Sequence, residues 1–197
     1  MMTWLSALRV RWLSQEASAL GLRRFLAASA LTLATAVGAW IAVPVPGSPV
    51  PITLQTFVVL AGAGLLGGRL SLQAQLAYVI LGGVGLPWFA GGTWGAPMLF
   101  GATGGYLIGF LLATWLIGRL LSGPRLRSGV QILGALVLGE LVLFACGVAW
   151  LGAYLHVSWA KACVLGALPF LPGDLVKVAA AAALIRSAGG RVRRFLA

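Results

Sequence analysis

The sequence is poor in charged residues, and above all in acidic ones. Of its 197 residues only three are Asp or Glu, and charged residues make up 9% of the chain against 60% hydrophobic residues. So little polar surface cannot cover a soluble globule. We therefore interpret the chain as an integral membrane protein.

Histidine and cysteine are also scarce, which excludes several kinds of site. A Ser/His/Asp arrangement has one candidate base, His156, and no motif surrounds it. Cys146 and Cys163 lie in apolar runs without C-x-x-C spacing, and we interpret both as small core residues. No metal-ligand spacing and no phosphate-binding G-x-x-x-x-G-K-[ST] loop occurs. The sequence predicts no enzyme, no metal and no cofactor, and any energy from ATP must come from another chain.

Basic residues, in contrast, are frequent. Fourteen Lys and Arg give a formal net charge of +11. A basic patch on a soluble domain would suggest nucleic acid, but here the basic residues fall in short connecting segments. In a membrane protein such charges set the topology, so we expect no nucleic-acid partner.

Six apolar runs are candidates for membrane-spanning helices, at residues 25–43, 54–68, 70–86, 106–121, 129–154 and 169–186. Placing both termini in the cytoplasm puts every arginine on the inner side and leaves only Lys161 in an outer connection. We predict an all-α integral membrane protein with six transmembrane helices and cytoplasmic N- and C-termini. A cleaved signal peptide is the alternative for the N-terminal part, but the run 25–43 is long enough to span and favours an uncleaved first helix.

We divide the chain into a basic cytoplasmic leader (1–24), one membrane domain (25–189) and a basic cytoplasmic tail (190–197). Two unusual connections fall on the outer face in this topology. Residues 44–53 are rich in proline and should be extended, and residues 87–105 are apolar, uncharged and rich in glycine. A third connection, 155–172, contains an apolar piece that we expect to be helical but too short to cross.

Asp174 and Lys177 stand together inside the sixth apolar run. Pro169 and Pro172 should end the preceding segment, so a new helix is expected to start here and to run to Arg186. Three residues apart, Asp174 and Lys177 share a helix face. A lone charge in lipid costs about 2.5–3.5 kcal/mol, so both need each other or a polar ligand, which makes them the first candidates for a site.

Small residues recur every fourth position in the first apolar run, at Ala30, Ala34 and Gly38. Such a stripe lets another helix approach closely. The spacing does not distinguish a partner protein from internal packing.

Four blocks of the sequence resemble one known family in order and spacing. They are SPVPITLQTF (48–57), GLPWFAGGTWG (85–95), GATGGYLIGF (101–110) and PFLPGDLVK (169–177). In these blocks the chain resembles the BioY family, the biotin-binding S components of energy-coupling factor (ECF) vitamin transporters. One departure is Ala102, where the family has proline in G-P-T-G-G-Y.

The resemblance implies a six-helix protein of the bacterial cell membrane that captures biotin from outside. By the family motifs, Gln55, Tyr106, Asp174 and Lys177 would bind the substrate. The ureido ring of biotin has two N–H donors and one carbonyl acceptor, which suit a carboxylate and an ammonium or amide group. Further candidates are aromatic residues that would cover the fused rings, and the alternative for each is an interfacial anchor: Trp88, Phe89 and, less favoured, Trp94.

The same resemblance implies partners. S components present a small-residue face to an ECF transmembrane coupling subunit, which works with ATPase subunits, and Ala30, Ala34 and Gly38 would form that face here. Two other interpretations stay open: an S component for another vitamin such as thiamine or riboflavin, and a structural membrane subunit without ligand. Glu140 matches no motif, and we expect it to be protonated or hydrogen-bonded to another helix.

Overall fold

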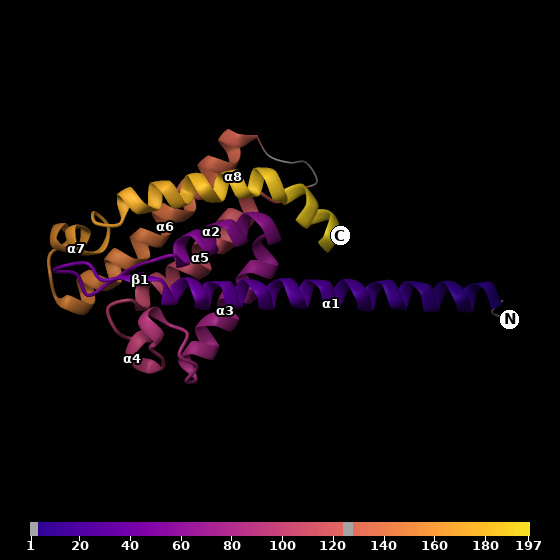
Figure 1. The fold of residues 1–197 in the computed structure, drawn as a ribbon, viewed down its shortest axis with the longest axis horizontal. Helices are drawn as coiled ribbons and strands as arrows, with labels where there is room; N and C mark the ends of the chain where they lie inside the picture. The colour runs from indigo at the N-terminus through magenta and orange to yellow at the C-terminus, as the bar shows by residue number, and fades with distance from the viewer. Residues whose placement is uncertain (1–3, 124–127) are drawn as a thin grey trace.

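The computed structural model describes residues 4–123 and 128–197, with side chains from residue 18 onward in those ranges. The chain forms a helical bundle (Figure 1). Both termini lie at one end of this bundle, and the short elements that connect the long helices gather at the opposite end (Figure 1). We call the latter the loop end.

Six longer helices form the bundle: α1 (Trp4–Trp40), α2 (Gln55–Leu66), α3 (Gly68–Gly83), α5 (Gly104–Leu120), α6 (Gly129–Leu155) and α8 (Leu171–Leu196). Each contains most of one predicted apolar run. Two of them are longer than predicted. α1 begins within the leader, which has no proline, and its N-terminal part extends beyond the bundle (Figure 1).

The predicted end of the last helix at Arg186 is wrong. α8 continues through Gly189 and Gly190 to Leu196, although glycine inside a helix costs about 1 kcal/mol. Tertiary contacts explain the continuation. Gly189 and Leu196 are buried, and the Arg24 guanidinium donates two hydrogen bonds to the Leu196 carbonyl oxygen, at 3.2 and 3.1 Å.

The connections agree with their predicted character. In the first, β1 (Ala42–Val43) pairs antiparallel with β2 (Ile52–Thr53), with Ala42 opposite Thr53. The second contains the 3₁₀ turn η1 (Ala90–Gly92) and the short helix α4 (Ala96–Leu99). The third contains α7 (Trp159–Gly166), which is too short to cross a membrane and meets α8 at a bend of 58°.

Among the described residues, two helices are long and apolar enough to cross a membrane by themselves: Ser18–Trp40 of α1, and α6. A third results if α7 and α8 are taken as one bent span. α2 and α5 are apolar but shorter. The helices are those of a membrane protein, while the count of six spans stays a prediction.

Two apolar clusters fill the bundle. The one nearer the loop end includes Phe110 of α5, Phe144 of α6 and Phe170 at the start of α8. The other is centred on α2, α5, α6 and α8 and includes Leu60, Ile117, Leu136, Val178 and Ile185. Helices α5 and α6 pack closely where Gly109 faces Leu143, since a Cβ at Gly109 would lie 3.0 Å from the Leu143 backbone. We call the first of the two apolar clusters the loop-end cluster and the second the inner cluster.

Candidate functional site

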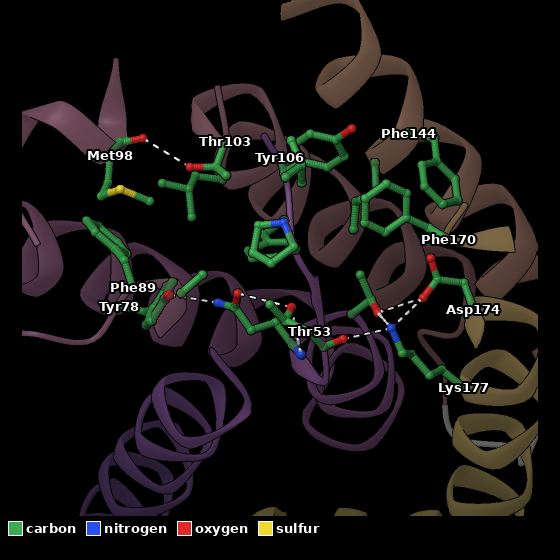
Figure 2. A pocket seen from close by; sticks show the side chains of 18 residues that line it. Thr53, Tyr78, Phe89, Met98, Thr103, Tyr106, Phe144, Phe170, Asp174 and Lys177 are labelled. Carbon is green, nitrogen blue, oxygen red and sulfur yellow. Dashed lines mark hydrogen bonds and ion pairs between the residues drawn. The ribbon is translucent and has the colours of Figure 1, made fainter. Parts of the chain in front are cut away.

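A pocket lies at the loop end of the bundle, and its lining comes from segments far apart in the sequence (Figure 2). The 44–53 connection, α2, α3, the 87–105 connection, α5, α6 and α8 all contribute to it. Its lining residues are Val50, Pro51, Thr53, Gln55, Thr56, Tyr78, Phe89, Ala90, Met98, Thr103, Tyr106, Leu107, Phe110, Leu143, Phe144, Phe170, Asp174 and Lys177. The lining is therefore mostly apolar and aromatic, with its charges on α8.

The charged part of the pocket is an ion pair. Lys177 Nζ lies 2.6 Å from Asp174 Oδ1, and the two side chains point toward each other (Figure 2). Lys177 Nζ also donates to the Thr53 carbonyl oxygen at 2.7 Å and to Thr56 Oγ1 at 3.0 Å, while Thr56 Oγ1 donates to Asp174 Oδ1 at 3.1 Å. The predicted shared face of Asp174 and Lys177 is confirmed, and the pair is anchored to the start of α2.

This ion pair is nearly removed from solvent, since the Lys177 and Asp174 side chains are 13% and 5% exposed. All three ammonium protons of Lys177 have a protein acceptor. Asp174, in contrast, accepts hydrogen bonds from Thr56 and Lys177 on the same oxygen, Oδ1. A carboxylate has about four acceptor positions, so Asp174 retains acceptor capacity for a donor in the pocket.

Gln55 lies in the lining, but both ends of its amide already have partners. Its Nε2 donates to the Tyr78 hydroxyl at 2.7 Å, and its Oε1 accepts from Thr53 Oγ1 at 3.3 Å. The Tyr78 hydroxyl in turn donates to the Trp88 carbonyl oxygen at 3.1 Å. This chain of bonds joins both loop-end connections to α3, so Gln55 holds the pocket wall together.

The aromatic candidates occupy different positions. Phe89 is buried, lines the pocket and packs edge-on against Tyr78, with ring centroids 5.5 Å apart. Trp88 is half-buried against the loop-end cluster and lies outside the pocket lining. Trp94 is 58% exposed. Phe89 is therefore the one of the three whose ring faces the pocket.

Tyr106 lines the pocket with its ring and not with its hydroxyl. The hydroxyl donates to the Gly166 carbonyl oxygen at the end of α7 (2.5 Å) and points away from the Asp174–Lys177 pair (Figure 2). A Cβ at Gly147 of α6 would collide with the Tyr106 ring. The ring is thus held between α5, α6 and α7 as a fixed wall.

Several lining residues were not anticipated from the sequence. Tyr78 and Phe144 lie in apolar runs, where an aromatic residue at helical spacing looks like ordinary core. Thr53, Thr56 and Phe170 lie inside two of the quoted blocks, 48–57 and 169–177. Their position inside these blocks is the sequence feature that could have indicated a role in the pocket.

The small-residue stripe of α1 is divided by the fold. Ala30 and Ala34 are exposed. Gly38 is buried, and a Cβ there would lie 3.3 Å from the Leu54 and Gln55 backbone. Internal packing is therefore the structural role of Gly38, while Ala30 and Ala34 remain open on the surface.

Within the described part of the chain, no group of three or more His, Cys, Asp or Glu side chains is arranged to hold a metal ion. The chemistry of the pocket lies in its buried carboxylate, its ammonium and its rings. A carboxylate with free acceptor capacity inside an aromatic wall suits a small, rigid ligand with N–H donors.

Comparisons with known proteins identify the family of this chain. The chain matches the model of the BioY family over residues 11–194. It is 40% identical over 161 residues to the "Biotin transporter BioY" of Thermotoga maritima, covering 82% of this chain and 92% of that protein. It is 42% identical over 147 residues to the "Probable biotin transporter BioY" of Pyrococcus horikoshii, covering 75% of this chain and 84% of that protein.

A solved structure has the same fold. It is a crystal structure of the S-component for biotin from an ECF-type ABC transporter, with a TM-score of 0.77 and 25% sequence identity, and the match covers 98% of this chain and 95% of that one. The relatives are named as transporters, which agrees with the expectation that the chain is not an enzyme. This protein is a member of the BioY family.

Proposed function

We propose that this membrane protein is the biotin-binding S component of a vitamin transporter. The observation that carries the proposal is the buried Asp174–Lys177 pair in the aromatic pocket, because Asp174 keeps acceptor positions free while Lys177 fixes its charge. The names of the relatives support biotin over another vitamin and over a subunit without ligand.

In this proposal the ureido ring of biotin lies at the α8 side of the pocket. Asp174 accepts from a ureido N–H, and the Lys177 ammonium, with three donors to distribute, exchanges one of its present partners for the ureido oxygen. Phe89 and Tyr106 cover the apolar parts of the ligand, and Gln55 holds the wall through Tyr78. Trp88 is retained as a candidate that reaches biotin only if the 87–105 connection shifts on binding.

We further propose six membrane spans, with both termini in the cytoplasm and the pocket on the outer side of the bacterial cell membrane. Two features support this topology. Both termini lie at the same end of the bundle, as an even number of spans requires (Figure 1). The pocket lies at the loop end, away from the basic segments that the positive-inside rule assigns to the cytoplasm. The division into leader (1–24), membrane domain (25–189) and tail (190–197) is part of this proposal.

The proposed partners are an ECF transmembrane coupling subunit and its ATPase subunits. Ala30 and Ala34 are the surface we assign to the coupling subunit, since they are small and exposed on α1 beside the exposed apolar residues Leu33 and Val37. Copurification from native membranes tests these partners: an ATPase and a second membrane subunit should accompany the protein.

Calorimetry on the purified protein tests the ligand. Biotin should bind much more tightly than thiamine, riboflavin or lipoate. Equal affinity for all four compounds, or no binding of biotin, would contradict the proposed function.

A further inference from the structure

Two buried polar side chains have no hydrogen-bond partner within the described part of the chain and lie outside the pocket lining. They are Glu140 of α6, which is 6% exposed, and Thr114 of α5, which is 0% exposed. On α6, Glu140 falls between Leu136 of the inner cluster and Leu143 of the loop-end cluster. The two orphaned groups therefore belong to a layer between the apolar clusters.

The ion pair of α8 lies in the same layer. Asp174 and Lys177 follow Phe170 of the loop-end cluster and precede Val178 of the inner cluster. Helices α6 and α8 pack against each other, and the groups that act electrostatically on Glu140 are Asp174 and Lys177. Glu140 thus lies next to the Asp174–Lys177 pair and outside the pocket lining.

Neither carboxyl oxygen of Glu140 receives a hydrogen bond from the described residues, as a buried ionised carboxylate would require. The Lys177 ammonium donates its three hydrogen bonds to Thr53, Thr56 and Asp174. Lys177 also balances only one of the two carboxylates. A second buried negative charge without a donor is far more costly than a neutral carboxylic acid, and it would stand beside a charge of its own sign.

A protonated Glu140, in contrast, fits the layer. Its O–H needs an acceptor, and Asp174 has acceptor positions that Thr56 and Lys177 do not use. We infer that Glu140 is a proton-binding site beneath the pocket, and that its protonated carboxyl donates a hydrogen bond to Asp174 and so positions Asp174 for the ligand. Glu140 is thereby a positioning residue that does not itself touch the ligand.

The consequence for biotin rests on the proposed function. When Glu140 loses its proton at alkaline pH, Asp174 loses a donor and gains a like charge as its neighbour, so biotin affinity should fall. Besides Asp174 and Lys177 on α8, Thr56 of α2 and Thr114 of α5 lie in or border this layer, and neither side chain titrates. No titratable group of α7 acts on Glu140 among the described residues.

The protonation itself is measured without biotin. The sequence has three acidic residues, and Glu140 shares its type only with Glu16. Carbon-13 NMR of protein labelled at the glutamate side-chain carboxyl should therefore show two resonances, assigned with Glu16→Gln as the matched control. We expect the Glu140 resonance to stay at the protonated position through neutral pH. An ionised Glu140 at neutral pH would overturn the inference whatever the ligand.

A biotin titration measures the coupling. Between about pH 7 and about pH 9, above the range where the carboxyl of biotin titrates, the parent should lose about tenfold in affinity. Glu140→Gln keeps a donor and cannot ionise, so its profile should be flatter, while Glu140→Leu should bind more weakly at every pH. Thr114→Val removes the other orphaned group and should keep the parent's profile.

The two sets of measurements separate the possible failures. The same alkaline fall in Glu140→Gln and in the parent would overturn the coupling to Asp174. A parent that binds no biotin at any pH would overturn the proposed function, while the NMR titration would still decide the protonation of Glu140.

Discussion

At the scale of single residues, the pocket combines one charged corner with rigid aromatic walls. The carboxylate of Asp174 lies in the first turn of α8, where the helix dipole favours a negative charge. Lys177 and Thr56 both bond its Oδ1. Most of the free energy of biotin binding should therefore come from Asp174 and Lys177, while the aromatic rings set the shape of the pocket.

The first prediction concerns the ion pair. Asp174→Asn keeps the shape but replaces a charged acceptor by an amide, so the loss of a charge-assisted hydrogen bond, about 1.5–3 kcal/mol, should weaken biotin binding about tenfold to a hundredfold. Lys177→Met should cost a similar amount, because it strands Asp174 without a buried partner. The measurement is a titration of both variants and of the double variant at matched expression.

If Asp174 and Lys177 act as one unit, the double variant should lose less than the sum of the two single losses. Two single variants that bind biotin like the parent would make this a structural ion pair, and the ligand would have to be sought elsewhere.

The second prediction separates the ring of Tyr106 from its hydroxyl. Tyr106→Phe removes the bond to the Gly166 carbonyl and should lower the free energy of unfolding by about 1 kcal/mol. Tyr106→Ala removes the wall as well and should lower biotin affinity more than Tyr106→Phe does. Equal affinity losses in the two variants would show that the hydroxyl, not the ring, matters to the ligand. Chemical unfolding and calorimetry give the two quantities.

At the scale of elements, α1 has two different faces. Gly38 packs on the start of α2, whereas Ala30 and Ala34 leave a smooth exposed patch next to larger apolar residues. The sequence pattern treats these three positions alike. They differ only in the folded protein, where α2 packs against Gly38 and leaves Ala30 and Ala34 exposed.

The third prediction uses that difference. Ala34→Trp should leave biotin binding intact and abolish association with the coupling subunit, because its bulk prevents close helix approach. Gly38→Trp is the contrasting variant and should lower stability and biotin affinity, since it displaces the backbone before Gln55. Copurification and calorimetry read out the two effects. If Ala34→Trp still copurifies with the coupling subunit, the exposed patch faces only lipid.

At the scale of the whole molecule, the two ends of the bundle differ. The pocket and the short connections occupy the loop end, and the two termini occupy the other (Figure 1). In the proposed topology, the pocket then faces the outside of the cell and the two termini face the cytoplasm.

The fourth prediction tests this orientation. In a background with Cys146 and Cys163 replaced by serine, Pro49→Cys in the first connection should react with a membrane-impermeant thiol reagent added outside intact cells. Ser187→Cys near the other end should react only after the membrane is opened. Both positions are exposed in the structure, so burial does not account for a difference. The reverse pattern would invert the proposed topology.

Much of this protein follows from its sequence alone. Hydrophobic runs predict the long helices because lipid selects for them, and the spacing of Asp174 and Lys177 predicts their shared face because helix geometry is local. The four sequence blocks indicate the family, which the comparisons confirm.

The tertiary structure decided the rest, because the deciding contacts join residues that sequence patterns cannot relate. Gln55 meets Tyr78 across 23 positions, and the Tyr106 hydroxyl meets Gly166 across 60. Apolar patterning makes Phe144 look like core, and only the packing of α6 against α8 turns it toward a pocket. The end of α8 was likewise set by burial of Leu196, which outweighs the helix-breaking tendency of two glycines.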